Sequence, residues 1–178
     1  MGRYSPRRIR EHFQLGDNAT TTTEKGRALE ELIRYVFESV PGIPVTRRDE
    51  QNVFLTEEID IAFWNDKSAD GFSFLPNIIL VECKNWSRPV GSEEVSYFID
   101  KIRHRGLDLG ILVAVNGITG SSEEITAAHY QVAFALHDGI RIIVITREEI
   151  EDLSDTEELI RLLKLKLCDL ALKGTTLV

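Results

Sequence analysis

The spacing of apolar residues predicts helices and strands that alternate along most of the chain. Apolar side chains recur at helical spacing in segments that are predicted to be helices: residues 23–39, 92–104, 121–136 and 155–173. Shorter apolar runs predict strands at residues 77–84, 107–115 and 140–145, and further strands with turns are expected between residues 45 and 64. Residues 146–149 read Thr-Arg-Glu-Glu, a capping box that predicts one more short helix.

The order of these segments predicts an α/β fold. Strands and helices alternate after residue 77, which is typical of parallel strands joined by helical crossovers. The earlier strands follow one another without a helix between them and are expected to be antiparallel. We therefore predict a mixed β-sheet flanked by helices. No internal repeat or linker divides it, so residues 23–178 are expected to form a single domain.

The last predicted helix carries a leucine-rich stripe. The stripe consists of Leu159, Ile160, Leu163, Leu167 and Leu170. Apolar residues at this spacing share one face of a helix and favour packing against a core. A dimer interface is the second interpretation of the same stripe.

The first 22 residues differ from the rest of the chain because they are polar and locally basic. Polar residues occupy positions 18 and 20–23. This composition predicts an N-terminal arm over residues 1–22 that has little reason to pack. The arm is interpreted as a solvated tail or, alternatively, as a contact for phosphate groups through its arginines: Arg3, Arg7, Arg8 and Arg10.

Composition bounds the class of protein. The chain has 178 residues, enough for one domain with a sizeable core, and 43% of them are hydrophobic. No apolar run reaches membrane-spanning length and the N-terminus lacks a signal-peptide core, so a cytoplasmic location is expected. The two cysteines lack the spacing of a zinc site. The formal net charge of -8 argues against a protein that coats nucleic acid nonspecifically.

Candidate chemistry is concentrated on two of the predicted strands. Asp60 lies in the stretch Glu-Ile-Asp-Ile-Ala-Phe-Trp, and Glu82 and Lys84 end the apolar strand that begins at residue 77. Glu82 and Lys84 are two residues apart and therefore share one face of their strand. Two carboxylates can bind Mg²⁺, and a lysine beside them can hold or activate a nucleophilic water. This combination is appropriate to phosphodiester hydrolysis. An ordinary ion pair at a solvated strand end is the alternative.

These motifs, taken in order, resemble the restriction-endonuclease-like superfamily with the PD-(D/E)xK site, and within it the Mrr-like group. The resemblance extends over roughly residues 22–152. Its main stretches are Gly-Arg-Ala-Leu-Glu at 26–30, Glu-Ile-Asp at 58–60 and Val-Glu-Cys-Lys-Asn-Trp at 81–86. The proline that often precedes the aspartate in this superfamily is Ile59 here.

The resemblance implies a restriction-endonuclease-like fold and Mg²⁺-dependent cleavage of DNA, with Mn²⁺ as a substitute ion. By this resemblance, Asp60 and Glu82 would hold the metal, with the backbone carbonyl of Cys83 as a further ligand. Lys84 would orient the attacking water or stabilise charge on the phosphate. Glu30 would support the site through water or a second metal. A homodimer is expected, because cleavage of both DNA strands needs two sites.

Other functions are compatible with the same residues. One is a nonhydrolytic module that binds protein or DNA on the same fold, and another is a resolvase that acts on branched DNA. An acidic protein needs local positive charge to contact DNA, and besides the arm the candidates are Lys101, Arg103 and Arg105. These residues end the helix predicted at 92–104, where they would also complement the helix dipole.

Overall fold

The computed structural model describes residues 2–51, 57–120 and 128–176. The strands are β1 (Val45–Gln51), β2 (Glu58–Trp64), β3 (Ile78–Lys84), β4 (Leu109–Ala114) and β5 (Arg141–Ile145). The helices are α1 (Pro6–Asn18), α2 (Thr22–Glu38), α3 (Ser92–His104), α4 (Ala128–His137), α5 (Arg147–Glu151) and α6 (Thr156–Lys173). The first part of the helix predicted at 121–136 lies outside the described residues.

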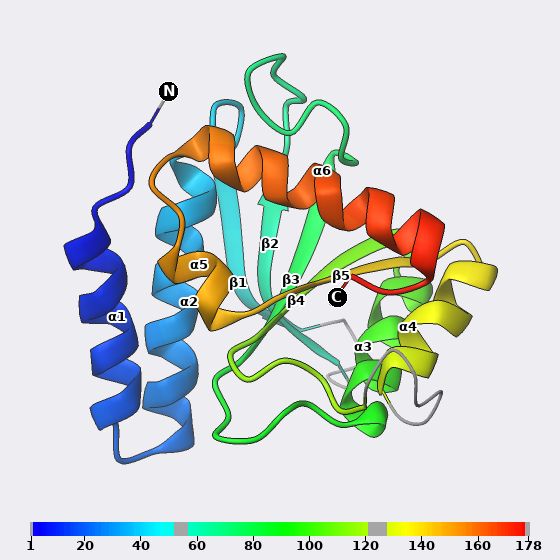
Figure 1. The fold of residues 1–178 in the computed structure, drawn as a ribbon, viewed down its shortest axis with the longest axis horizontal. Coiled ribbons are helices and arrows are strands. Elements are labelled where there is room, and N and C mark those ends of the chain that lie inside the picture. Colours follow the sequence, from blue (N-terminus) through cyan, green and yellow to red (C-terminus); the bar gives the residue numbers. More distant parts are fainter. Residues whose placement is uncertain (1, 52–56, 121–127, 177–178) are drawn as a thin grey trace.

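A single five-stranded sheet in the order β1-β2-β3-β4-β5 forms the centre of the fold (Figure 1). β1 pairs with β2 and β2 with β3 in antiparallel fashion, whereas β3, β4 and β5 are parallel neighbours. α3 connects β3 to β4, and α4 lies in the connection from β4 to β5. The predicted mixed sheet, antiparallel in its first part and parallel in its second, is therefore confirmed.

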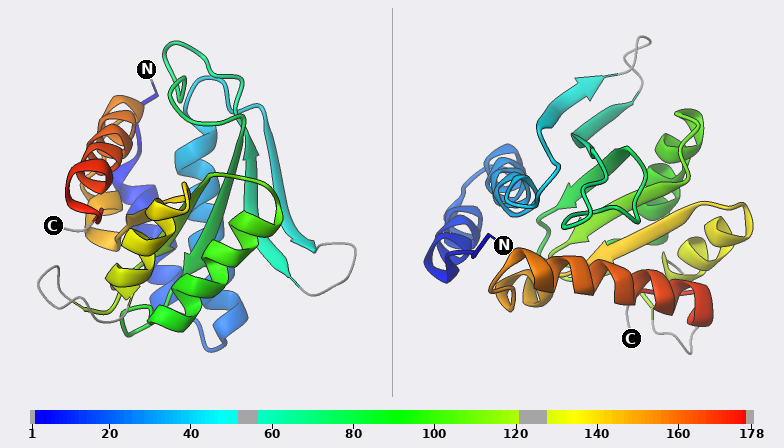
Figure 2. Two further views of the ribbon diagram at one scale, coloured as in Figure 1. Left: turned by 90° about the vertical axis from the view of Figure 1, so that its right-hand side faces the viewer. Right: turned by 90° about the horizontal axis from the view of Figure 1, so that it is seen from above.

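Helices cover both faces of the sheet (Figure 2). Ile79, Val81 and Cys83 of β3 belong to a core cluster that also takes in apolar residues of α1, α2, α5 and α6. Leu80 belongs to a second cluster with residues of α3 and α4. Because side chains alternate along a strand, Glu82 projects toward the same layer as Leu80. β3, which is apolar on both faces, thus has near its end an acidic side chain, Glu82, that is directed toward α3.

Capping boxes fix the beginnings of two helices. In α5, the side chain of Thr146 accepts from the N–H of Glu149 and the Glu149 carboxylate accepts from the N–H of Thr146, as the sequence predicts. The same reciprocal arrangement joins Thr21 and Glu24 at the beginning of α2. α2 therefore begins slightly earlier than the sequence indicates.

The first 22 residues are not the unpacked arm that the sequence predicts. Ser5 caps a helix, α1, that lies beside α2 (Figure 1). Ile9 and Phe13 are one turn apart on its inner face and are both buried in the core shared with α2. Two large apolar side chains at this spacing are enough to dock a short helix when a neighbouring helix offers a complementary apolar surface.

The end of α1 approaches the end of β3 at Gly16. A Cβ atom at this position would lie 2.5 Å from Nδ2 of Asn85, the residue that follows β3. Asn85 in turn donates a hydrogen bond of 3.1 Å to the carbonyl oxygen of Lys25 in α2. α1 therefore supports the junction of α2 and β3, the elements that carry Glu30 and Lys84.

Phe13→Ala is expected to lower the free energy of unfolding by about 3–5 kcal/mol, because it removes a ring from a packed core and leaves a cavity. The Phe13 side chain is only 2% exposed. Urea denaturation followed by circular dichroism measures the effect. Leu15→Ala on the same helix is the control, since Leu15 is 63% exposed and its loss should change the stability by less than about 1 kcal/mol. Equal stabilities of the two variants would contradict the docking of α1.

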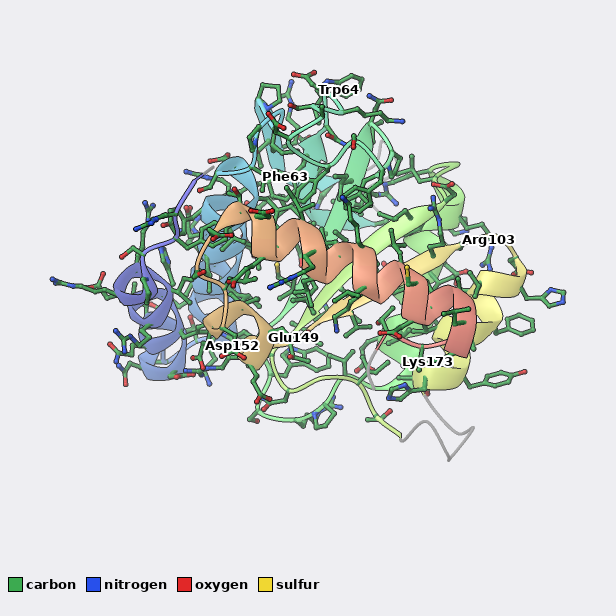
Figure 3. The ribbon with its side chains drawn as sticks, turned by 45° about the horizontal axis from the view of Figure 1, so that its top comes forward. Phe63, Trp64, Arg103, Glu149, Asp152 and Lys173 are labelled. Carbon is green, nitrogen blue, oxygen red and sulfur yellow. The ribbon has the colours of Figure 1, made fainter. Side chains whose placement is uncertain are left out.

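The leucine-rich stripe of α6 belongs to the core. Leu159, Leu163 and Leu170 are buried, and Ile160 and Leu167 are partly buried against the core cluster that contains Leu159 and Leu163. Leu170 belongs to the second cluster. Figure 3 shows α6 lying across the sheet. Core packing of this stripe is thus confirmed, and its use as a dimer interface is wrong, because its side chains are already covered by the protein's own sheet. Within the described residues, no helix has both the length and the apolar character that crossing a bilayer requires.

Candidate active site

Asp60 and Glu82 lie at facing positions of β2 and β3. The antiparallel register pairs Ile61 with Val81, so the next positions along it are Asp60 and Glu82. Residues that face each other across an antiparallel pair project from the same side of the sheet. Both side chains line one cavity. The structure thus brings together the two carboxylates that the sequence singles out.

The Asp60 side chain takes the place of a backbone acceptor between the two strands. Its Oδ2 accepts a hydrogen bond of 2.7 Å from the N–H of Cys83. The N–H and C=O of one strand residue point to the same side, so the Cys83 carbonyl also faces β2. The next carbonyl, that of Lys84, points the other way and accepts from the N–H of Val115 at 3.1 Å. The Cys83 carbonyl is therefore directed to the same side of β3 as Asp60.

Glu82 is held by two lysines. Lys84 donates to Oε1 of Glu82 at 2.8 Å. Lys101, from α3, donates to Oε1 at 3.0 Å and to Oε2 at 2.8 Å. A carboxylate as buried as Glu82 would be costly without such partners, and here both of its oxygens are bound by ammonium groups.

The carboxyl group of Asp60 experiences an unfavourable environment for its charge. Burial, followed by the negative charge of Glu82, raises the pKa of Asp60 to about 6, although the bond from Cys83 opposes this. Burial also opposes the charge on Lys84, but the carboxylates of Glu82 and Asp60 outweigh it and raise the pKa of Lys84. Lys84 is therefore an ammonium at neutral pH, whereas Asp60 is poised between its two forms in mildly acidic solution.

Glu30 approaches the site from α2. Burial and then the charge of Asp60 raise the pKa of Glu30 to about 7. The contribution of Asp60 to the raised pKa of Glu30 indicates that the two carboxyl groups are near each other. Glu30 is not among the residues that line the cavity with Glu82 and Lys84. The structure thus places Glu30 beside Asp60 and outside the main cavity.

The cavity at the site is open and has a volume of about 650 Å³. Asp60, Glu82 and Lys84 contribute to its lining, together with Lys101. Most of the remaining wall is acidic or aromatic: Glu57, Glu58, Glu93, Glu94, Trp86 and Tyr97. A cavity of this size holds a small ligand or one segment of a larger one.

The basic end of α3 is not the exposed DNA-facing patch that the sequence suggests. Lys101 is buried on Glu82. Arg103 is paired with Asp100, and also with Asp138 at 3.1 Å. Arg105 is paired with Glu57 at 2.6 Å, and His104 contacts the other oxygen of the same carboxylate. These cations are neutralised by neighbouring carboxylates, so they do not form a free basic surface.

Lys101 is the residue at the site whose position the sequence does not indicate. It stands on the flank of the apolar stripe of α3, in register with Glu94 and Tyr97, which also line the cavity. The spacing of these three residues would have indicated a shared helix face. The pairing with Glu82 depends on how α3 packs on β3, which no local pattern encodes.

The fold and the site together define a class of protein. A mixed sheet that presents an aspartate on one strand and Glu-x-Lys at the end of its neighbour is the restriction-endonuclease-like fold with the PD-(D/E)xK signature. A family model described as restriction endonuclease, Mrr_cat, matches residues 23–154. The chain belongs to this restriction endonuclease family. No curated protein matches the chain.

Proposed function

We propose that this protein is a Mg²⁺-dependent DNA endonuclease that hydrolyses phosphodiester bonds. The observation that carries the proposal is the convergence of Asp60, Glu82 and Lys84 in one open cavity at the ends of β2 and β3. Membership of a restriction endonuclease family supports DNA as the substrate class. The residue types and their arrangement supply the metal-binding oxygens and the cationic donor that such hydrolysis requires.

The donor set of the site suits a hard divalent cation. Asp60, Glu82 and the Cys83 carbonyl offer oxygen atoms, and Mg²⁺ is commonly held by one or two carboxylates, water and substrate phosphate. The described residues contain no group of three or more His, Cys, Asp or Glu side chains that could hold a metal ion, so water and phosphate would have to complete the coordination. A cation here would offset the burial and the repulsion by Glu82 that together raise the pKa of Asp60 to about 6.

The side chains have separate roles in the proposed reaction. When bound, Mg²⁺ would polarise the scissile phosphate and lower the pKa of the attacking water. Lys84 donates hydrogen bonds from the cavity wall, where its side chain is 22% exposed, and so orients that water or stabilises charge on the phosphate. Asp60 and Glu82 hold the cation, with the Cys83 carbonyl as a further ligand. Glu30 supports Asp60 through water or a second metal.

We propose that Arg88 contacts a DNA phosphate beside the site. Its side chain is 65% exposed, and its guanidinium lies 4.8 Å from the ring centroid of Trp86. Its ion pair with Glu94 is long, at 3.5 Å, and leaves most of the side chain accessible to a phosphate. Nζ of Lys84 lies 5.7 Å from the same ring. Arg88 and Lys84 are therefore both close to Trp86, which lines the cavity together with Lys84, and a DNA strand bound over Trp86 would contact both cations.

Arg88→Gln is expected to weaken DNA binding uniformly across sequences and to lower the slope of log affinity against log salt by about one unit. Fluorescence anisotropy with labelled duplexes in EDTA measures both quantities without cleavage. Arg161→Gln is the matched control, since its side chain is 70% exposed on α6. The alternative contact through the N-terminal residues is tested by Arg7→Gln and Arg10→Gln, which retain the packing of α1. An unchanged slope for Arg88→Gln would contradict the assignment.

We also propose that the protein acts as a homodimer, because two sites are needed to cleave both strands of a duplex. The covered stripe of α6 is excluded as the interface. The proposal therefore rests on the requirement for two sites and not on a particular surface.

A DNA-cleavage assay tests the proposed function. Supercoiled, linear, methylated and branched DNA are incubated with the protein in Mg²⁺, Mn²⁺ or EDTA. Conversion of supercoiled DNA to open-circular or linear forms only with a divalent cation is the expected result. Preference for the branched substrate would identify a junction resolvase. Binding without cleavage under every condition would contradict hydrolysis and support the nonhydrolytic module, which the acidic cavity wall also suits.

A further inference from the structure

Lys101 is a buried cation that the proposed reaction does not use. Its side chain is 5% exposed, and its partner Glu82 has a side chain that is 4% exposed. A lysine is rarely buried to this extent unless its charge is paired. Its ammonium group binds both oxygens of Glu82 and lies 5.1 Å from the ring centroid of Tyr97. The position of Lys101 is therefore fixed from more than one direction.

The two lysines on Glu82 differ in their freedom to move. Lys84 contacts one oxygen of Glu82 and is 22% exposed toward the cavity. Lys101 contacts both oxygens and is almost fully enclosed. If Lys84 turns toward a water or a phosphate, Glu82 keeps its other ammonium partner. The loss of Lys101 would instead leave a buried carboxylate with only the more mobile partner.

We propose that Lys101 is a positioning residue, which holds Glu82 in place so that Lys84 is free to serve the reaction. This inference rests on the proposed metal-dependent function. It has a consequence for metal binding, because a fixed positive charge on both oxygens of Glu82 repels a divalent cation and competes with it for those oxygens. Lys101 therefore weakens the affinity of the site for the cation and orders the carboxylate that receives it.

The test compares Mn²⁺ binding by the wild type and by Lys101→Met in the full chain without DNA, using isothermal titration calorimetry. Removal of the competing charge is expected to tighten Mn²⁺ binding by at least about tenfold. The variant should melt at a lower temperature than the wild type without metal and recover most of the difference with Mn²⁺. A purely structural ion pair would lower the melting temperature without tightening Mn²⁺ binding.

Lys101→Arg is the conservative control and should restore wild-type Mn²⁺ affinity, because it returns a positive charge to Glu82. Lys164→Met, an exposed lysine of α6, should leave the affinity unchanged. If Lys101→Met does not fold, Lys101→Gln carries the same expectation, since it removes the charge and keeps a hydrogen-bond donor toward Glu82. Equal affinity in the wild type and in the uncharged variant would overturn the role of Lys101 while leaving the proposed function in place.

A crystal structure of the wild type soaked with Mn²⁺ tests the inference without any variant. The expected result is that Nζ of Lys101 stays within hydrogen-bond distance of Glu82 and that Nζ of Lys84 has left it. Release of Lys101 with retention of Lys84 would overturn the proposed division of roles. Failure of the wild type and of every variant to bind Mn²⁺ would overturn the metal site of the proposed function as well.

Discussion

Asp60→Asn is expected to abolish Mg²⁺-dependent DNA cleavage, with a loss of roughly a thousandfold or more, while the metal-free protein becomes no less stable. The amide loses the negative charge that a divalent cation requires. Its oxygen can still accept the 2.7 Å hydrogen bond from the N–H of Cys83, so the junction of β2 and β3 is preserved. The substitution also removes the repulsion between the buried carboxylates of Asp60 and Glu82.

The stability difference between Asp60→Asn and the wild type should depend on pH. In the folded protein, the pKa of Asp60 is raised from 3.8 to about 6, so the folded state binds the proton more tightly than the unfolded state does. The wild type therefore gains stability as the pH falls through about 6. The gain is complete below 3.8, the pKa of Asp60 in the unfolded chain. The variant has no carboxyl group at position 60. Its stability relative to the wild type is therefore greatest at about pH 8, and the difference disappears toward about pH 4.

Cleavage of supercoiled DNA and urea denaturation at several pH values measure these two effects. Asp152→Asn, at an exposed position that follows α5 (Figure 3), is the matched control and should change neither activity nor the pH dependence of stability. Cleavage at the wild-type rate by Asp60→Asn would remove Asp60 from the proposed site. A stability difference that is independent of pH would show that Asp60 does not carry the raised pKa.

Much of the fold follows from local patterns in the sequence. The bounds of α3, Ser92–His104, agree with the prediction because an acidic first turn, an amphipathic middle and a basic last turn all indicate the same helix. Apolar residues occupy both faces of β3, β4 and β5, and this pattern predicts buried strands. α1 could not be predicted in this way. Its apolar residues are few among arginines, and the surface that covers them belongs to α2.

The site was predictable only in part, for a related reason. Glu82 and Lys84 are adjacent on one strand, and Asp60 lies on the preceding strand, so sequence order and alternation are enough to bring them together. Lys101 is 19 residues from Glu82, and its contact with that carboxylate depends on how α3 packs. In sequence it looks like another cation at a helix end. The composition of the cavity wall likewise depends on packing, since it combines residues of β1, β2, β3 and α3.

Lys84→Met is expected to lower the cleavage activity about as much as Asp60→Asn does. It should change the free energy of unfolding by less than about 1 kcal/mol. Methionine keeps an unbranched apolar side chain of similar length and removes the ammonium group. Glu82 would not be left as an unpaired buried charge, because Lys101 still binds both of its oxygens. The variant therefore separates a catalytic role of Lys84 from a structural one.

Single-turnover cleavage with saturating Mg²⁺ and urea denaturation of the same preparation measure the two consequences of Lys84→Met. Lys173→Met is the matched control, because this lysine is about half exposed at the end of α6 and pairs with Asp169 (Figure 3). DNA affinity in EDTA should be nearly unchanged, since one partly enclosed ammonium contributes little to binding outside the metal-loaded site. If Lys84→Met instead unfolds and Lys101→Met remains stable, the roles of the two lysines on Glu82 are the reverse of those inferred from their burial.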